Sequence, residues 1–233
     1  MTYIKGLLFY KDGTLFDFHH TWSVWCHRFI SEMAQSDKIA AERLAQALDF
    51  NMLSREFRPN SPVIAGTLEI LVEVTLKTLP DLGAQTIRQG ILDTATHAQM
   101  VPVVPLIPLL DGFLQDGLRL GVATNDGEAP ARVHLQSQGI HDHFHYVAGY
   151  DTGHGEKPAP GMLLAFCEAC SLDPSEVAMI GDSTHDLHSA AAAGMKRVGV
   201  LTGIASHDDL YPHADIVLPD IGHLPAWLRS LST

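Results

Sequence analysis

Short apolar runs recur along the chain, and each is followed closely by a glycine, an asparagine or an aspartate. Runs of this length that end in turn-forming residues are typical of strands buried in a parallel sheet. We therefore predict strands at 4–10, 118–123, 146–148, 177–180, 198–201 and 216–218.

Helical periodicity fills the intervals between the strands predicted after residue 118. Two of these segments, 132–138 and 187–193, are followed by Gly139 and Gly194, at the position where helices commonly end. Regular alternation of strands and helices indicates a parallel sheet covered by helices on both faces. We therefore predict an α/β fold with a Rossmann-like doubly wound parallel sheet.

The interval between the first two predicted strands is different, because about a hundred residues of mostly helical periodicity lie there. One helix is expected to begin with Ser61 as its N-cap and Pro62 in its first turn. The proline-rich segment 101–108 then returns the chain to the sheet and leads into a helix that ends near Gly117. We predict a core domain of residues 1–16 and 100–233, and an inserted helical domain of residues 17–99. The apolar stripes of this insertion are Trp22, Trp25, Phe29 and Met33; Ile64, Leu68, Leu71, Thr75 and Leu79; and Ala84, Ile87, Ile91 and Ala95.

The composition of the 233 residues is that of an ordinary globular chain, with 46% hydrophobic and 18% charged residues. Fifteen Lys and Arg against 27 Asp and Glu give a net charge of −12, which does not favour nucleic acid or an anionic membrane surface as partner. The apolar stretch 101–110 is shorter than a membrane span and contains three prolines. No secretory signal is recognisable, so we expect a soluble cytoplasmic protein.

Some conspicuous residues are better explained by packing than by chemistry. Cys167 and Cys170 form a C-x-x-C within a helical pattern, and without a second ligand pair we favour buried thiols over a zinc or redox site. His141 and the two histidines that alternate with it are interpreted as a loop leading into a strand, not as a metal site. For Trp22 and Trp25, core packing is favoured over substrate contact.

Polar and charged residues follow the ends of several predicted strands. In an open parallel sheet ligands bind outside the carboxyl ends of the strands, so residues from separate strands meet at one edge. The candidates are Asp12, Gly13 and Thr14 after the first strand, Thr124 and Asn125 after the second, Lys157 before a helix expected at 158–169, and Asp182 and Asp186 after the fourth.

Asp12, Asp182 and Asp186 are the candidate metal ligands. Asp182 and Asp186 are four residues apart at the start of a helix with Ser183 as N-cap, so they are expected on one face. Carboxylates gathered in one pocket repel one another unless a hard cation lies between them. Mg²⁺ is commonly held by a few carboxylates together with a substrate phosphate, and we therefore predict a Mg²⁺ site.

The remaining candidates suit a phosphate dianion. Gly13, Thr14, Thr124 and Asn125 offer backbone, hydroxyl or amide donors at the starts of loops and helices, and Lys157 adds a positive charge. The expected partner is therefore a small phosphorylated metabolite. No feature of the sequence specifies an oligomeric state.

These residues, in this order, resemble the motifs of the haloacid dehalogenase superfamily of phosphohydrolases, in the branch similar to phosphoglycolate phosphatases. The first motif, a carboxylate two residues before Asp-Gly-Thr-Leu, corresponds to residues 10–15. The Thr or Ser motif corresponds to Thr124, the Lys-Pro motif to Lys157, and the Gly-Asp-x-x-x-Asp motif to residues 181–186. The helical insertion after the first motif resembles the mobile cap of the family.

The resemblance implies a two-step phosphoryl transfer through an aspartyl phosphate. In that scheme Asp12 protonates the leaving alcohol and later activates water, and its backbone carbonyl contacts Mg²⁺. Asp182 binds the metal directly, and Asp186 binds it directly or through water. Thr124 donates to the phosphoryl oxygens, and Lys157 offsets the charge of nucleophile and phosphate.

Tyr10 departs from the family pattern, because it stands where the attacking aspartate is expected. A neutral phenol is a poor nucleophile and a poor ligand for a hard metal at pH 7. We expect its ring at the rim of the cleft, with the hydroxyl turned toward water or Lys157. The chain is then either a variant of an active enzyme, which we favour because the other motif residues remain, or a natural pseudoenzyme.

Three alternatives share the same fold. A non-catalytic phosphate-ligand binder would bind phosphate without turnover. A dehalogenase is disfavoured by Asp12, since halide release does not require a proton donor for an alkoxide. A sugar-phosphate mutase would share the core motifs, and product analysis would separate it from a hydrolase.

Overall fold

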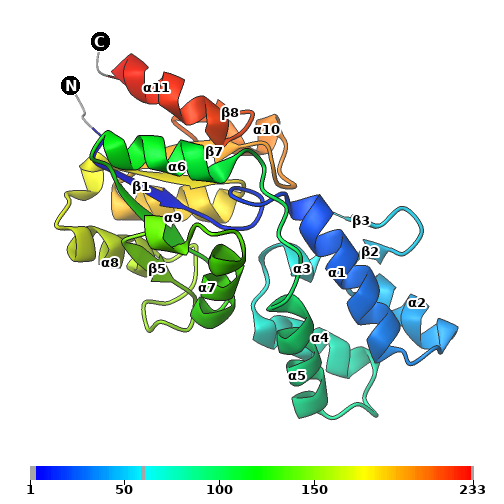
Figure 1. Cartoon of the computed structure of the whole chain (residues 1–233). Helices are drawn as coiled ribbons and strands as arrows, with labels where there is room; N and C mark the ends of the chain where they lie inside the picture. The colour runs from blue at the N-terminus through cyan, green and yellow to red at the C-terminus, as the bar shows by residue number, and fades with distance from the viewer. Residues whose placement is uncertain (1–3, 59–60, 232–233) are drawn as a thin grey trace. The chain divides into compact units, whose positions relative to one another are not determined.

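The computed structural model describes residues 4–58 and 61–231, apart from the side chain at position 65. The chain divides into two compact units (Figure 1). One unit comprises Met1–Phe18 with Met100–Thr233, and the other comprises His19–Gln99. Each unit is described by itself.

The first unit contains a six-stranded sheet in the order β5-β4-β1-β6-β7-β8, in which each neighbouring pair is parallel. This confirms the predicted α/β fold with a parallel sheet. The chain builds outward from β1 on one side and then crosses back to continue on the other, so β1 is central. The strands are β1 (Gly6–Phe9), β4 (Arg119–Ala123), β5 (Tyr146–Ala148), β6 (Val177–Gly181), β7 (Lys196–Val200) and β8 (Ile216–Leu218).

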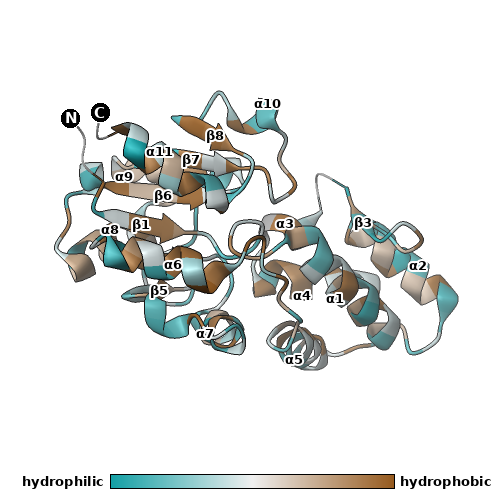
Figure 2. Cartoon of the chain, turned by 45° about the horizontal axis from the view of Figure 1, so that its top comes forward, coloured by the Kyte–Doolittle hydropathy of each residue, from teal (hydrophilic) through white to brown (hydrophobic). Residues whose placement is uncertain are grey.

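Helices cover both faces of this sheet (Figure 1). Side chains alternate between the faces along β1. Leu8 and Tyr10 join a buried cluster with residues of α8 and α9, whereas Phe9 stacks on Phe113 of α6 at a centroid distance of 6.5 Å. Figure 2 shows mainly hydrophobic colouring along the strands. The helices are α6 (Leu106–Gln115), α7 (Glu128–Ser137), α8 (Gly161–Cys170), α9 (Thr184–Ala193), α10 (His207–Leu210) and α11 (Leu224–Leu231), with 3₁₀ turns at His141–His143, Pro174–Glu176 and Ile221–His223.

The second unit is mainly helical. Its aromatic centre confirms the core role expected for the tryptophans, because Trp25 lies 5.4 Å from Trp22 and 5.2 Å from Phe29 between ring centroids. The Trp25 indole donates to Thr94 Oγ1 at 3.0 Å, so its polar group is satisfied within the core. The elements are α1 (Phe18–Met33), α2 (Lys38–Ala47), β2 (Phe50–Asn51), β3 (Glu56–Phe57), α3 (Pro62–Ala65), α4 (Leu68–Thr78) and α5 (Ala84–Ala95).

One prediction for this unit was wrong. The helix expected to begin after Ser61 is divided into α3 and α4, because the backbone at Gly66 is extended and ends α3. Ser61 does cap α3, since its Oγ accepts from the Val63 N–H. An antiparallel hairpin, β2–β3, also interrupts the helical pattern. Asn51 starts its turn by accepting from the backbone N–H groups of the second and third residues after it.

The conspicuous cysteines and histidines lie on separate elements of the first unit. Cys167 and Cys170 are free thiols on α8, and burial raises the pKa of Cys167 to about 11. His141 and His143 belong to a 3₁₀ turn before β5, and His143 pairs with Asp111 at 3.0 Å. No helix in the described part of the chain is both long and apolar enough to cross a membrane.

Candidate functional site

The carboxyl ends of β1, β4 and β6 lie side by side and supply most of the candidate residues. Phe9, the last residue of β1, is in register with Val122 of β4 and Ile180 of β6. The backbone N–H of Tyr10 extends this pairing by donating to the Ile180 carbonyl at 2.8 Å. The segments that follow these strands therefore begin at one level of the sheet.

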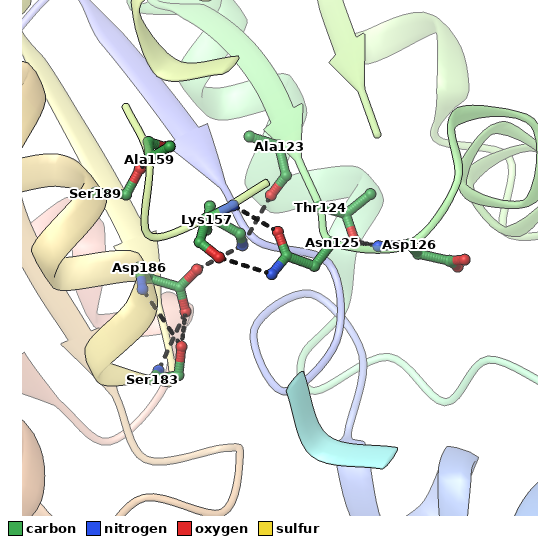
Figure 3. Close-up of polar contacts among 9 residues, drawn as sticks. All are labelled: Ala123, Thr124, Asn125, Asp126, Lys157, Ala159, Ser183, Asp186 and Ser189. Carbon is green, nitrogen blue, oxygen red and sulfur yellow. Dashed lines mark hydrogen bonds and ion pairs between the residues drawn. The ribbon is translucent and has the colours of Figure 1, made fainter. Parts of the chain in front are cut away.

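Lys157 is held at this edge by Asn125, which follows β4 (Figure 3). The Asn125 amide accepts from the Lys157 backbone N–H at 2.9 Å and donates to its carbonyl at 3.1 Å. The Lys157 ammonium then donates to the Ala123 carbonyl at 3.1 Å and to Asp186 Oδ1 at 2.5 Å. Asn125 thus orients Lys157 in this structure, and its predicted contact with phosphate stays a prediction.

Asp186 is fully buried, and both of its oxygens have partners. Oδ1 pairs with Lys157, whereas Oδ2 accepts from the Ser183 hydroxyl at 2.7 Å and from its N–H at 3.2 Å. This is the reciprocal capping arrangement that starts α9. Further along α9, Ser189 donates to the Ala159 carbonyl at 2.8 Å and ties the helix to the segment that carries Lys157. Charge and helix capping therefore fix Asp186 in place.

Asp182 differs from Asp186 in how well its oxygens are hydrogen-bonded. Its Oδ1 is buried without a hydrogen-bond partner among the described residues. Burial first, and then the charge of Asp186, raises the pKa of the Asp182 carboxyl well above its usual range. This carboxylate is therefore poorly satisfied by the protein itself.

Two glycines from separate loops make room for Asp182. Gly13 has a φ of +71°, and a Cβ there would collide with the Asp182 carboxylate. The same is true of Gly203, in the loop after β7. Thr202 joins the two loops, because its hydroxyl donates to the Gly13 carbonyl at 2.6 Å. Thr202 and Gly203 were not among the predicted site residues, although they follow a predicted strand end in the same way as the other candidates.

The two threonines of the site are also buried. Thr124 Oγ1 accepts from the Asp126 N–H at 3.0 Å (Figure 3), which leaves the hydroxyl hydrogen for another acceptor. Thr14 Oγ1 is buried without a hydrogen-bond partner in the described ranges.

The ring of Tyr10 is buried in the core, not at the rim where it was expected. It is 9% exposed and belongs to the cluster that includes Leu163 and Phe166 of α8. Lys157 contacts the face of this ring, with Nζ 3.5 Å from the centroid, and the expected turn of the hydroxyl toward Lys157 is replaced by a cation–π contact. Burial first, and then the neighbouring carboxylates, raises the pKa of Tyr10 well above its usual value. The phenol therefore stays neutral at pH 7.

Lys11 is a further residue that the sequence did not single out. Its side chain is fully buried, and its Nζ lies 2.8 Å from each carboxylate oxygen of Asp12. It also lies 3.1 Å from His134 Nδ1 and 3.3 Å from Asp126 Oδ2. Burial lowers the pKa of Lys11, but the charges of Asp12 and Asp126 outweigh it and the net shift is upward. Lys11 is thus a buried ammonium ion that binds the candidate acid–base residue.

The fit of these residues to Mg²⁺ rests on Asp182. Among the described residues no three His, Cys, Asp or Glu side chains form a metal-binding group. The side chain of Asp12 is engaged by Lys11, so only its backbone carbonyl would be available to a metal in the way the motif resemblance implies. The buried Oδ1 of Asp182, which has no hydrogen-bond partner among the described residues, suits a hard cation that would offset the repulsion between Asp182 and Asp186.

Comparison with known proteins agrees with the motif resemblance. A family model described as haloacid dehalogenase-like hydrolase matches residues 7–200. The chain is 34% identical over 122 residues to a phosphoglycolate phosphatase of Rhodospirillum rubrum, a match that covers 52% of this chain and 51% of that protein. The chain therefore spans about half the length of the curated relatives it matches.

Solved structures share the fold over nearly the whole chain. A HAD phosphatase from Thermococcus onnurineus superposes with a TM-score of 0.68 at 22% identity, covering 97% of this chain and 98% of that one. The L-2-haloacid dehalogenase of Xanthobacter autotrophicus superposes with a TM-score of 0.64 at 16% identity, covering 97% and 98%. Since a phosphatase and a dehalogenase both match, the fold does not choose between the two reactions.

Proposed function

The chain belongs to the haloacid dehalogenase-like hydrolase family, and we propose that its site is built for Mg²⁺-dependent hydrolysis of small phosphomonoesters, as in phosphoglycolate phosphatases. The observation that carries this proposal is the buried, unpaired Oδ1 of Asp182, next to a lysine and a second carboxylate that are already paired. Such an oxygen is costly unless a ligand satisfies it.

Asp182 would bind Mg²⁺ directly, Asp186 would bind it through water because both of its oxygens have protein partners, and Asp12 would contribute its backbone carbonyl. The ion, when bound, supplies positive charge that offsets the carboxylates and polarises the phosphate. Gly13 and Gly203 keep the space around Asp182 clear of side chains.

Thr124 and Thr14 would donate hydroxyl hydrogen bonds to phosphate oxygens, together with backbone N–H groups of the loop at Gly13. Lys157 would contribute charge without moving, because Asn125 and Asp186 already hold it. Asp12 would give a proton to the leaving alkoxide and take one from water in the second step. The helical unit His19–Gln99 is proposed as the cap that selects the substrate.

Tyr10 removes the attacking group from this site. The chain as it stands should therefore bind Mg²⁺ and phosphate but hydrolyse phosphomonoesters little or not at all. The buried ring beneath Lys157 also supports a second candidate, a non-catalytic phosphate-ligand binder, because Tyr10 is well accommodated where it lies.

The test is to restore the carboxylate. Tyr10→Asp should give Mg²⁺-dependent release of phosphate from aryl and alkyl phosphomonoesters, and the gain should reach the scale of a covalent nucleophile, up to about a million-fold. Tyr10→Asn, of similar size and uncharged, is the control and should stay inactive. If Tyr10→Asp binds Mg²⁺ and remains inactive on a broad panel, the binder replaces the hydrolase.

A further inference from the structure

Lys11 lies outside the residues that the proposed chemistry uses, yet its ammonium is buried among ionisable groups. Its ammonium lies within 3.3 Å of two carboxylates and one imidazole nitrogen, contributed by Asp12, Asp126 and His134. An ammonium has three N–H donors and no acceptor, so His134 Nδ1 must accept from it. One buried cation therefore joins the loop after β1, the loop after β4 and helix α7.

Lys11 lies in the bend that follows β1, two residues after Phe9. Its side chain is buried there and reaches His134 of α7. An apolar side chain would fill such a buried position without the cost of removing a charge from water. Buried ion pairs are often no more stabilising than well-packed apolar groups. Stability alone therefore does not account for a lysine here.

The contacts of Lys11 restrict the orientation of the Asp12 side chain. Lys11 contacts both of its carboxylate oxygens at 2.8 Å, which fixes the side-chain torsions of Asp12. Without the cation, the negative charge of Asp126 would face Asp12 across the position that Nζ now occupies. A carboxylate that must reach both a leaving oxygen and a water molecule needs a defined orientation.

We propose that Lys11 is a positioning residue that holds the Asp12 carboxylate in the orientation required for proton transfer, an inference that rests on the proposed phosphohydrolase function. In a chain with Tyr10→Asp, the carboxylate introduced at position 10 forms a bond to phosphorus while the phosphorus–oxygen bond of the ester breaks, and a protonated Asp12 carboxyl gives its proton to the alkoxide oxygen. Asp12 then takes a proton from the water that attacks the phosphoryl group. Lys11 touches neither substrate nor phosphorus.

The structural test uses the chain as it exists. Lys11→Met keeps an unbranched side chain and removes the charge. A crystal structure of this variant should show the Asp12 carboxylate turned away from Asp126. Lys5→Met, at the other end of the same strand, is the matched control and should leave Asp12 in place, because Lys5 pairs with Glu176 at the surface. An unmoved Asp12 in Lys11→Met overturns the proposal.

Lys11→Met leaves two carboxylates facing each other, which could prevent folding. The variant Lys11→Met/Asp126→Asn removes that repulsion and still lacks the cation. Asp12 is expected to lose its fixed orientation in this variant as well, seen as a second conformer or a displaced carboxylate. An Asp12 held in its original position overturns the proposal here too.

The kinetic test compares leaving groups in a chain that carries Tyr10→Asp. A nitrophenolate leaves with little help from an acid, whereas an alkoxide needs a proton. Adding Lys11→Met should lower kcat/KM, which reports the step in which the leaving group departs, at least about tenfold more for an alkyl phosphate than for nitrophenyl phosphate. Equal losses of kcat/KM on both substrates would mean that Lys11 has a structural role only. If Tyr10→Asp alone is inactive, the proposed function fails. The position of Asp12 in the Lys11→Met structure then still shows whether Lys11 orients the Asp12 carboxylate.

Discussion

The ion pair between Lys157 and Asp186 is the electrostatic centre of the site, and its removal should be costly. Both side chains are buried, with exposures of 2% and 0%, and the two charged atoms are 2.5 Å apart. Lys157→Met leaves the Asp186 carboxylate buried without its cation, which typically costs about 3–5 kcal/mol. The same change removes the cation–π contact with Tyr10, worth about 2 kcal/mol when desolvated, although the two losses overlap.

The assay is urea denaturation followed by circular dichroism, applied to a double-mutant cycle. Lys157→Met and Asp186→Asn should each destabilise the chain, and the double variant should lose less than the sum by about 1–3 kcal/mol. Lys77→Met is the control. The Lys77–Glu73 pair has a similar distance, 2.6 Å, but its side chains are 73% and 65% exposed. Its removal should therefore cost no more than about 0.5 kcal/mol.

The cycle would refute this reasoning in either of two ways. A loss below about 1 kcal/mol for Lys157→Met would mean that water or another group compensates Asp186. Additive single losses would mean that the two residues stabilise the fold independently and that Lys157 is not held by Asp186.

Two further predictions concern the surroundings of Asp182. The raised pKa of Asp182 means that the folded chain binds its proton more tightly than the unfolded chain does, so this carboxyl destabilises the fold as pH rises above the ordinary value of 3.8. Asp182→Asn should therefore raise the Tm of the Mg²⁺-free chain at pH 7, and this gain in Tm should disappear in acid. The same variant should not bind Mg²⁺ in calorimetry; an unchanged Mg²⁺ affinity would contradict the assignment of Asp182 as a metal ligand. Gly203→Ala should destabilise the chain by about 1–3 kcal/mol and weaken Mg²⁺ binding, because the new Cβ displaces Asp182. Gly112→Ala, on α6 with open space around it, should instead be neutral or stabilising by up to about 1 kcal/mol.

The sheet was predictable because its signal is strong and local. Buried parallel strands appear as apolar runs, and the residues that follow them gather at one edge by topology alone. That rule was enough to predict that Asn125 lies at the same edge as Asp182 and Asp186. It applies equally to Thr202 and Gly203, which follow the fifth predicted strand and to which the rule was not extended.

The missed features depend on contacts between distant residues. No local pattern in the sequence distinguishes Lys11 from the other residues that follow a strand, because it is the packing of α7 that brings His134 to it. The expected position of Tyr10 was wrong for a related reason, because the residues of α8 that surround its ring are about 150 positions away. The break between α3 and α4 falls at Gly66, whose extended backbone ends α3 within the apolar stripe that predicted a single helix.

The central claim is that this site lacks only the nucleophile of an aspartyl-phosphate phosphohydrolase. The most direct measurement is to quench the Tyr10→Asp variant during turnover of a phosphomonoester with Mg²⁺ and to locate the phosphoryl group by peptide mass spectrometry. The account predicts one added phosphoryl group, labile to base, on the peptide that contains position 10, and none in the unaltered chain or in Tyr10→Asn. Turnover by Tyr10→Asp with the phosphoryl group on another residue, or with no phosphorylated intermediate under conditions that trap it in an active relative, would contradict the account.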